Sequence, residues 1–320
     1  MGVSANTNET YDVSTIREDL QDALVSISPT ETPVMTAIGR KNVKNTYFEW
    51  GVVDLAAASG SNRVIEGEAA PGNDAATNAV RQGNYTQISD KVVEVSDTAN
   101  SVNGAGNAQT TAKQIAYKLK ELKRDMEKML TDNVAASAGA SGTARQSAGL
   151  VAFLRTNADR GVGGADGTTS GSGVSGYVDA AATDGTQRTL TEALLKSVIA
   201  SCWDNGAEPS LVVCGSSQKQ VISTFTGNAT KFKDITDKTL SAAIDIYVSD
   251  FGELQIVPSR FSRSRDVLVL DPNYARVAYL TPTAQKPLAR TGHSDRRLIS
   301  VEYGLQVDNE AAHGVVADIS

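Results

Sequence analysis

The sequence predicts an α+β protein with an extended first half and a compact, mixed α/β second half. Three observations support this prediction. A long amphipathic helix is expected over residues 111–134, about thirty polar residues separate two strand candidates before it, and short strands alternate with helices after Gln187. The chain has 320 residues, which is enough for one large or two modest domains with a buried core.

The N-terminal region predicts an arm rather than a domain. Residues 12–27 carry apolar side chains at three- and four-residue steps, which is typical of a short amphipathic helix. The stripe consists of Ile16, Leu20, Ala23 or Leu24, and Ile27. Ser14 suits the N-cap, Ser28-Pro29 ends the helix, and a short apolar piece over 34–38 follows. Nothing here builds a core of its own, so we expect residues 1–45 to lie against something else.

The next segment predicts a long hairpin. Residues 46–53 favour a strand with Phe48, Trp50 and Val52 on one side, and a second strand candidate runs from Asn84 to Val95. The segment between them is rich in Ala, Gly, Asn and charge and cannot bury much of itself, so it is either a flexible excursion or a long hairpin that packs on another subunit. The contact candidates are Trp50, Arg63, Glu66, Glu68, Arg81 and Tyr85. Plain solvation is the alternative for any one of these charges.

The strongest local signal is the helix over residues 111–134. Its apolar stripe is formed by Ile115, Leu119, Leu122, Met126, Met129 and Leu130. The other faces are expected to hold Lys113, Lys118, Lys120, Lys123, Arg124, Glu127 and Lys128. Such a helix is roughly 36 Å long, and a single stripe on it indicates a sheet packed along most of its length.

A low-complexity region follows the helix. Residues 133–187 are rich in Ala, Ser, Gly and Thr, and residues 161–176 have almost the composition of a linker. Residues 171–176 match the letters of a dinucleotide-binding fingerprint, but that site needs a buried strand before the glycines and a helix after them. We therefore expect no cofactor here.

The second half predicts alternating helices and strands. Thr189 and Glu192 form a capping-box pattern for a helix that Gly206 ends. A buried strand over 211–214, a helix over 217–225 and a hairpin with its turn at 250–253 follow. Further strands are expected over 267–270, 276–280 and 298–307.

Composition and spacing favour a structural protein over an enzyme. The net charge of −7 disfavours tight binding of nucleic acid. Cys202 and Cys214 lack zinc-site spacing, and neither His293 nor His313 lies in a nucleophile motif, so we expect no metal site and no catalysis. No stretch approaches the roughly 20 apolar residues that cross a bilayer, and the N-terminus lacks signal-peptide features. We expect a protein made and used in a cytoplasm, with both cysteines reduced.

Four motifs, taken in order, resemble one protein family. They are Thr32-Pro33-Val34-Met35 to Gly39, Asn45 to Trp50, Arg81 to Ile88, and Glu121 to Asp125. The residues of these motifs, and the order in which they occur, resemble those of the major head (capsid) proteins of tailed bacteriophages, which have the Hong Kong 97 fold. The resemblance covers most of the chain, although residues 161–187 look like an insertion, and the joint order carries more weight than any single motif.

The resemblance implies an architecture and a function. It implies an N-terminal arm over 1–45, an E-loop over 46–100, a peripheral domain with the spine helix over 101–187, and an axial domain over 188–320 whose last strands return to the peripheral domain. The function implied is self-assembly, as hexamers and pentamers, into the icosahedral head of a virion that encloses double-stranded DNA without sequence-specific binding. Assembly is expected in the host bacterial cytoplasm, with a portal and a decoration protein as partners.

The same resemblance implies a further partner. The founding member of the family carries a long helical N-terminal segment that serves as built-in scaffold and is then cleaved off. No comparable segment precedes the arm in this sequence, so we expect a separate scaffolding protein.

Two other classes of protein remain open from the sequence. A secreted or surface adhesive protein would fit the Gly/Ser/Thr-rich middle and the low aromatic content, but it requires a secretion route. A cytoplasmic α/β enzyme would have to place its chemistry in the second half, at His293 or His313.

Overall fold

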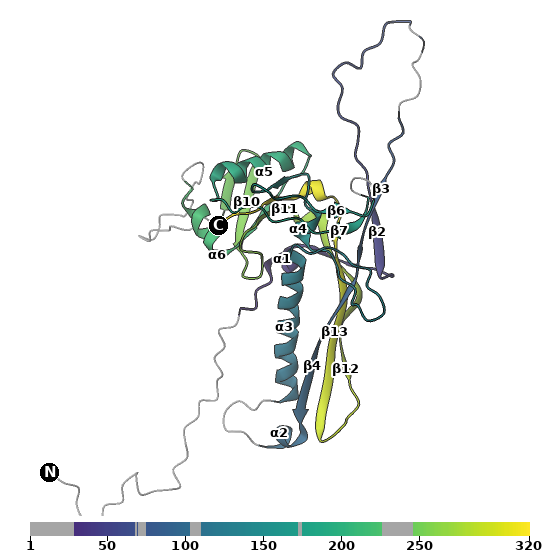
Figure 1. Ribbon diagram of the computed structural model, residues 1–320, viewed down its shortest axis with the longest axis vertical. Helices are drawn as coiled ribbons and strands as arrows, with labels where there is room; N and C mark the ends of the chain where they lie inside the picture. Colours follow the sequence, from purple (N-terminus) through teal and green to yellow (C-terminus); the bar gives the residue numbers. More distant parts are fainter. Residues whose placement is uncertain (1–28, 68, 70–74, 103–109, 172–174, 226–245) are drawn as a thin grey trace, which may run out of the picture.

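The computed structural model describes residues 29–67, 69, 75–102, 110–171, 175–225 and 246–320. The predicted helix over 12–27 and the contact candidate Glu68 lie outside these residues. Figure 1 shows an elongated molecule in which one long helix runs beside a narrow sheet, a globular α/β lobe lies beyond one end of the helix, and a thin limb projects past the lobe. The α+β class predicted from the sequence is confirmed.

Three sheets make up the strand framework. The first has the order β1 (Gly39–Asn42), β12 (Ala275–Pro287), β13 (Ser294–Val307), β4 (Gln87–Ser96). The second has the order β5 (Ala158–Asp159), β14 (Gly314–Val316), β11 (Val267–Leu270), β8 (Leu211–Cys214), β10 (Gly252–Pro258), β9 (Ile246–Ser249). The third has the order β2 (Tyr47–Val52), β3 (Val80–Tyr85), β7 (Gly176–Ala180), β6 (Thr168–Thr169).

The described helices are α1 (Pro33–Ala37), α2 (Asp97–Ser101), α3 (Thr111–Thr131), α4 (Leu150–Phe153), α5 (Glu192–Asp204) and α6 (Ser216–Ser223), with 3₁₀ turns at Pro272–Tyr274 and Glu310–Ala312. Two of the described helices, α3 and α5, are longer than ten residues. In the described part of the chain, no helix combines the length and apolar composition that a bilayer crossing needs.

Helix α3 confirms the long helix predicted from the sequence. It packs on β4 and β13 (Figure 1), and Leu122, Met126 and Leu130 are buried against that sheet. The helix ends at Thr131, three residues before the predicted end at Val134. The helix carries a single apolar stripe because one side of it packs on this sheet along much of its length.

Strands β12 and β13 are much longer than predicted. The sequence indicated strands over 276–280 and 298–307, whereas the two strands form an antiparallel hairpin in which Pro287 pairs with Arg297. The extra residues of β12, from Thr281 to Pro287, are mostly exposed and polar. A strand that is solvated on both faces lacks the alternation that a sequence pattern detects.

The single strand predicted from Asn84 to Val95 is wrong, because two strands in different sheets share this segment. Strand β3 pairs with β2, and β4 pairs with β13. The buried Asn84 fixes the point at which the chain passes from one sheet to the other. Its amide nitrogen donates to Leu305 O at 2.7 Å, and its Oδ1 accepts from Ala148 N at 3.0 Å. A buried amide with both ends bonded specifies one backbone path.

A buried carboxylate holds the Gly-rich region that follows α4 at two of its glycines. Asp318, at φ 58°, is fully buried, and its carboxylate accepts from Gly161 N at 3.0 Å, Gly185 N at 2.9 Å and Arg265 Nη2 at 2.6 Å. Burial raises the pKa of Asp318, but the two N–H groups and the guanidinium lower it by more, so this pKa lies below its usual range. Gly171 follows β6 and Gly176 begins β7, so a strand rather than a helix follows the last glycine of the fingerprint match.

The second half forms the lobe around the six-stranded sheet, which mixes parallel and antiparallel pairs. Helix α5 is capped by Thr191, whose Oγ1 accepts from Leu194 N, so the predicted Thr189 capping box is wrong. Glu192 instead pairs with Lys196 at 2.8 Å. Cys202 and Cys214 are free and buried, as predicted, and burial raises the pKa of their thiols to about 12 and about 11.

Candidate assembly surfaces

The base of the limb is the antiparallel ribbon formed by β2 and β3, which belongs to the third sheet. Phe48, Trp50 and Val52 of β2 are buried, as the alternation in the sequence predicted. The Trp50 ring lies 6.3 Å from that of Phe153 in α4, which anchors the ribbon to the body of the protein. The ribbon therefore fixes the direction in which the limb leaves.

Three tyrosines cover the other side of this base. The ring of Tyr85 lies 4.8 Å from Tyr47 and 5.1 Å from Tyr177. A Cβ at Gly83 would lie 2.6 Å from the Tyr47 hydroxyl oxygen, so this position requires glycine. Burial, followed by the charge of Glu49, raises the pKa of Tyr47 to about 12, so the ring stays a neutral packing element at physiological pH.

The limb itself consists of residues 53–79, and its described part is exposed throughout. Figure 1 shows it as a long loop extending well beyond the three sheets. Leu55 is 84% exposed, Val64 69% and Ile65 77%. Exposed apolar side chains gathered on one projecting segment are typical of a surface that another molecule covers.

The structure separates the predicted contact candidates into two groups. Arg63 and Glu66 lie in the exposed limb, whereas Trp50, Arg81 and Tyr85 lie at its base. Trp50 is buried within the subunit and Tyr85 is half-buried in the tyrosine cluster. Arg81 forms an ion pair with Glu49 across the ribbon while its side chain remains 74% exposed.

A buried carboxylate that the sequence analysis placed on a polar face joins α3 to the start of the described chain. Glu127 is fully buried, and its Oε1 and Oε2 accept from the N–H groups of Val34 and Met35, each at 2.8 Å. Burial raises the pKa of Glu127, and the two N–H donors oppose that shift. The signal available in the sequence was weak: Glu127 directly borders the apolar stripe.

The lobe carries a second exposed apolar surface. Trp203 at the end of α5 is 51% exposed and Phe251 in the β9–β10 turn is 38% exposed, with their ring centroids 5.2 Å apart. A depression of about 280 Å³ lies beside them, between α5 and the same turn. Exposed aromatic pairs are typical of the anchor residues of protein interfaces.

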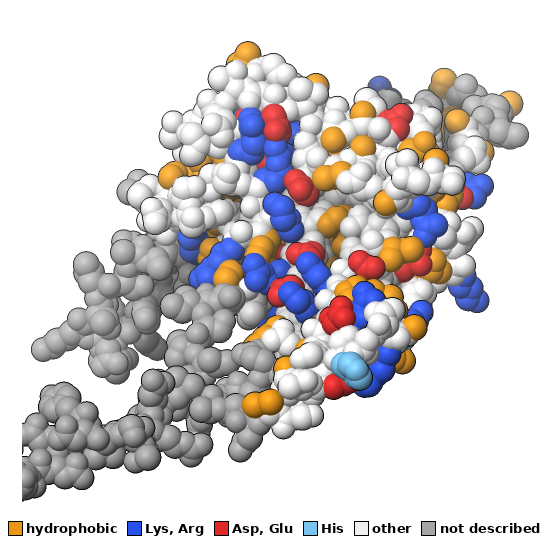
Figure 2. Space-filling model, turned by 60° about the horizontal axis from the view of Figure 1, so that its bottom comes forward, with side chains coloured by type: hydrophobic (Ala, Val, Ile, Leu, Met, Phe, Trp, Pro, Cys, Tyr) orange, Lys and Arg blue, Asp and Glu red, His pale blue; other side chains and the backbone are white. Residues whose placement is uncertain are grey.

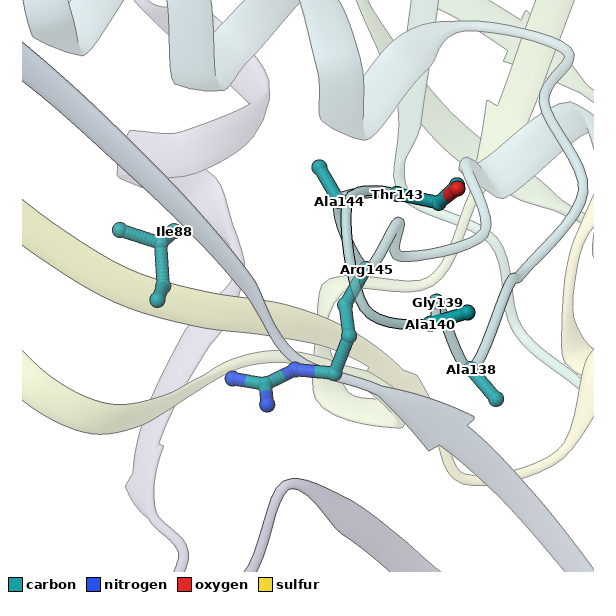
Figure 3. Close-up of a pocket in the computed structure, with 7 residues that line it drawn as sticks. All are labelled: Ile88, Ala138, Gly139, Ala140, Thr143, Ala144 and Arg145. Atoms are coloured by element: carbon teal, nitrogen blue, oxygen red, sulfur yellow. The ribbon is translucent and has the colours of Figure 1, made fainter.

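A further depression, of about 340 Å³, lies beside the turn over 138–145. Its walls are the alanines of that turn and Ile88, which is 62% exposed. Figure 3 shows Arg145 reaching from the turn toward the strand that carries Ile88. The guanidinium is already paired with Glu302 at 2.5 Å, so it fixes the turn against the sheet.

Charge on the exposed face of the long helix and narrow sheet is mixed in sign. Figure 2 shows Lys and Arg side chains interspersed with Asp and Glu over this face. Several are paired within the subunit, including Lys91 with Asp125 at 2.7 Å and Arg296 with Glu94 at 3.2 Å. Interspersed charges favour short-range contacts between proteins over binding of a polyanion.

The two histidines have different surroundings in the structure. His313 is fully buried, and its Nδ1 accepts from Asp271 N at 3.2 Å. Burial lowers its pKa to about 4. His293 is exposed in the turn between β12 and β13. In the described part of the chain, no group of three His, Cys, Asp or Glu residues could hold a metal ion.

Sequence comparison finds relatives of one kind. The family model described as SU10 major capsid protein matches residues 4–320. The major capsid protein of Escherichia phage Phieco32 is 38% identical over 104 residues, which span 32% of this chain and 29% of that protein. The chain thus matches less than a third of the length of this relative.

Structural comparison extends the likeness to nearly the whole chain. The capsid of cyanophage A-1(L) matches with a TM-score of 0.67 at 14% identity over 97% of this chain and 98% of that chain. The capsid of cyanophage P-SCSP1u matches with a TM-score of 0.64 at 10% identity over 100% and 97% of the two chains. The SrpI encapsulin of Synechococcus elongatus PCC 7942 matches with a TM-score of 0.56 at 12% identity over 95% and 93%. The predicted Hong Kong 97-type fold is confirmed.

Proposed function

Because this chain belongs to the SU10 major capsid protein family and is a structural component of a tailed-phage head, we propose that its copies close into an icosahedral shell by exchanging limbs. The observation that carries this proposal is the limb over residues 53–79, which projects from a rigid base and exposes apolar side chains (Figure 1). Its partner is a second copy of the same chain.

The energetics favour contact with another subunit. Full burial of an aliphatic side chain contributes about 1.5–3 kcal/mol, and three such side chains, Leu55, Val64 and Ile65, lie along the limb. Ordering the limb costs entropy, so each contact alone is modest. A closed shell repeats the contact at every symmetry-related position, and the modest terms add up.

The ribbon at the base and the limb have different roles in this proposal. Arg63 and Glu66, and with them Glu68, make ion pairs with the neighbouring subunit. Trp50, Tyr85 and the Arg81–Glu49 pair set the direction of the limb instead. The exposed face of Arg81 leaves it able to contact a neighbour as well.

The four domains named from the resemblance are part of the proposal. We assign residues 1–45 to the arm, 46–100 to the E-loop, 101–187 to the peripheral domain and 188–320 to the axial domain. Strand β4, in the last part of the E-loop segment, pairs with β13 and so joins this segment to the narrow sheet. The exposed Trp203 and Phe251 are then candidates for contacts between axial domains in hexamers and pentamers.

The partners follow from the same role. We propose a separate scaffolding protein, a portal and a decoration protein, with assembly in the cytoplasm of the host bacterium. The shell encloses double-stranded DNA without reading its sequence, and the net charge of −7 together with the mixed surface supports this. The role is structural rather than enzymatic, and neither an adhesive nor an α/β enzyme is favoured by the family.

Electron microscopy of the purified protein tests the proposal. The protein is expressed alone and together with the other head genes, and the particles are imaged in negative stain. We expect uniform closed shells only in the second case. Uniform, correctly sized shells from this chain alone would contradict the need for a separate scaffolding protein. A protein that stays monomeric in both cases would contradict the proposal that its copies form a shell.

A further inference from the structure

An open groove runs beside α3 on the half of the narrow sheet that the helix leaves uncovered. Helix α3 packs on β4 and β13, whereas β12 and the edge strand β1 continue the same sheet beyond it. Strands lie about 4.8 Å apart and packed helices about 8–10 Å apart, so a four-stranded sheet has room for a second helix beside the first.

The groove is apolar in its floor and of useful size. Its volume is about 590 Å³, and Leu119, Leu122 and Met126 of α3 form one wall while Tyr279 and Pro282 of β12 form the other. An engineered cavity of about 150 Å³ accommodates a benzene ring, so this groove holds roughly four times that volume. It can therefore receive several aliphatic side chains from one helix face.

The rim of the groove is cationic. Arg40 of β1 and Lys123 of α3 line it, and no ion pair involves either of them among the residues that the structure describes. An occupant with carboxylates beside an apolar stripe would match both the floor and the rim.

We propose that residues 12–27 of the same chain dock in this groove as an amphipathic helix. The segment has an apolar stripe at helical spacing, and its charged residues are Asp12, Arg17, Glu18, Asp19 and Asp22, four acids against one base. By helical periodicity Asp19 flanks the apolar stripe beside Leu20, on the side where its carboxylate can reach the cationic rim.

The position of the tether supports this occupant. Met35 lines the groove, and only five residues separate Ile27 from Pro33 at the start of α1. Six peptide steps span at most about 20 Å, so the end of the segment cannot lie far from this end of the groove. A tether of this length gives an effective concentration in the millimolar range, which favours the segment over a free competitor.

The tether also sets the register. Ile27 lies nearest to α1, at the end of the groove where Met126 neighbours the Glu127 that binds α1. The segment then runs parallel to α3. Leu20 lies seven residues before Ile27, as Leu119 does before Met126, so Leu20 faces Leu119.

Disulfide formation between introduced cysteines tests this register. We expect Leu20→Cys with Leu119→Cys to form a bond within one chain roughly tenfold faster than Leu20→Cys with Tyr117→Cys, because Tyr117 lies two residues away on the opposite face of α3. Cys202 and Cys214 are buried with raised thiol pKa values and do not compete. If Leu119→Cys unfolds the protein, Thr283→Cys on β12 replaces it.

Two further measurements separate the proposal from its rivals. In a mixture of light and heavy isotope-labelled chains, cross-linked peptides must be all light or all heavy. Lys123→Glu must slow cross-linking, and adding Asp19→Lys must restore it. The proposal would be overturned by mixed-label peptides, by equal cross-linking rates for the two cysteine pairs, or by an unchanged rate in Lys123→Glu. The occupant of the groove would then be a limb of another copy or a scaffolding protein.

Discussion

The carboxylate of Glu127 accepts the backbone N–H of Met35 at 2.8 Å, joining two residues 92 positions apart in a site that excludes water. The adjacent N–H of Val34 completes the pair. Helix α1 is only five residues long and would not persist alone. Its position on α3 therefore depends on this carboxylate together with the burial of the Val34 and Met35 side chains, and so does the point at which the N-terminal arm leaves the body.

Replacing Glu127 by Ala should detach α1. Two buried N–H groups would lose their acceptor, which costs about 1–3 kcal/mol each in the free energy of unfolding. Hydrogen exchange should show faster exchange at Val34 and Met35, and thermal unfolding should shift downward. Lys128→Ala, on the exposed face one residue away, is the control and should leave both measurements unchanged.

Replacing Asp318 by Asn should loosen the Gly-rich region. Asn tolerates the left-handed backbone of this position, so the change removes the charge that binds Arg265, Gly161 and Gly185 without adding strain. We expect a loss of about 1–3 kcal/mol in unfolding free energy and faster hydrogen exchange over residues 161–187. Glu121→Gln, which weakens a partly exposed pair with Lys118 outside this region, is the control and should cost less than about 1 kcal/mol.

The buried His313 should make the protein sensitive to acid. Its pKa is about 4 in the folded protein and about 6.5 in the unfolded chain, so the stabilisation is present above pH 6.5 and is lost as the pH falls toward 4. His313→Asn keeps an acceptor for Asp271 N and cannot be protonated. The stability difference between the two proteins should therefore change by at most about 3 kcal/mol over this range.

Chemical denaturation at a series of pH values measures that difference. Burial raises the pKa of Asp266 to about 6, which gives an opposite trend in the same range, but it is present in both proteins and cancels. The exposed His293→Asn is the control. A flat difference between wild type and His313→Asn would show that His313 does not titrate as its burial requires.

Replacing Trp203 and Phe251 by Ala should impair assembly more than folding. Both side chains are exposed, so their loss should change the unfolding free energy by less than about 1 kcal/mol. If they anchor contacts between axial domains, the yield of closed particles should fall sharply in a sedimentation assay. Glu208→Ala, also exposed near the end of α5, provides the comparison, and equal particle yields in all three proteins would exclude this surface.

Local patterns in the sequence were sufficient for the elements whose stability is local. The stripe of α3 and the alternation of Phe48, Trp50 and Val52 were predicted correctly, because helix and strand periods are visible within a short window. The exposure of Arg63 and Glu66 in the limb also follows from composition.

The features that the sequence did not predict depend on residues far apart in the chain. Glu127 is buried because two N–H groups more than ninety residues away bind it, and Asn84 breaks a strand because Leu305 and Ala148 bind its amide. The Gly-rich region has linker composition, yet Asp318 near the chain terminus orders it. No window of sequence contains both members of such a pair.

The central claim is that the limb over residues 53–79 is stabilised by a neighbouring copy, and a limb replacement tests it most directly. Residues 55–78 are replaced by a Gly/Ser linker, either short or of the original length, which leaves β2 and β3 and their tyrosine cluster intact. Co-expressed with the other head proteins, both variants should yield folded, soluble subunits with wild-type thermal unfolding and no closed particles in the electron microscope. Closed particles of normal size from the short-linker variant would contradict the account.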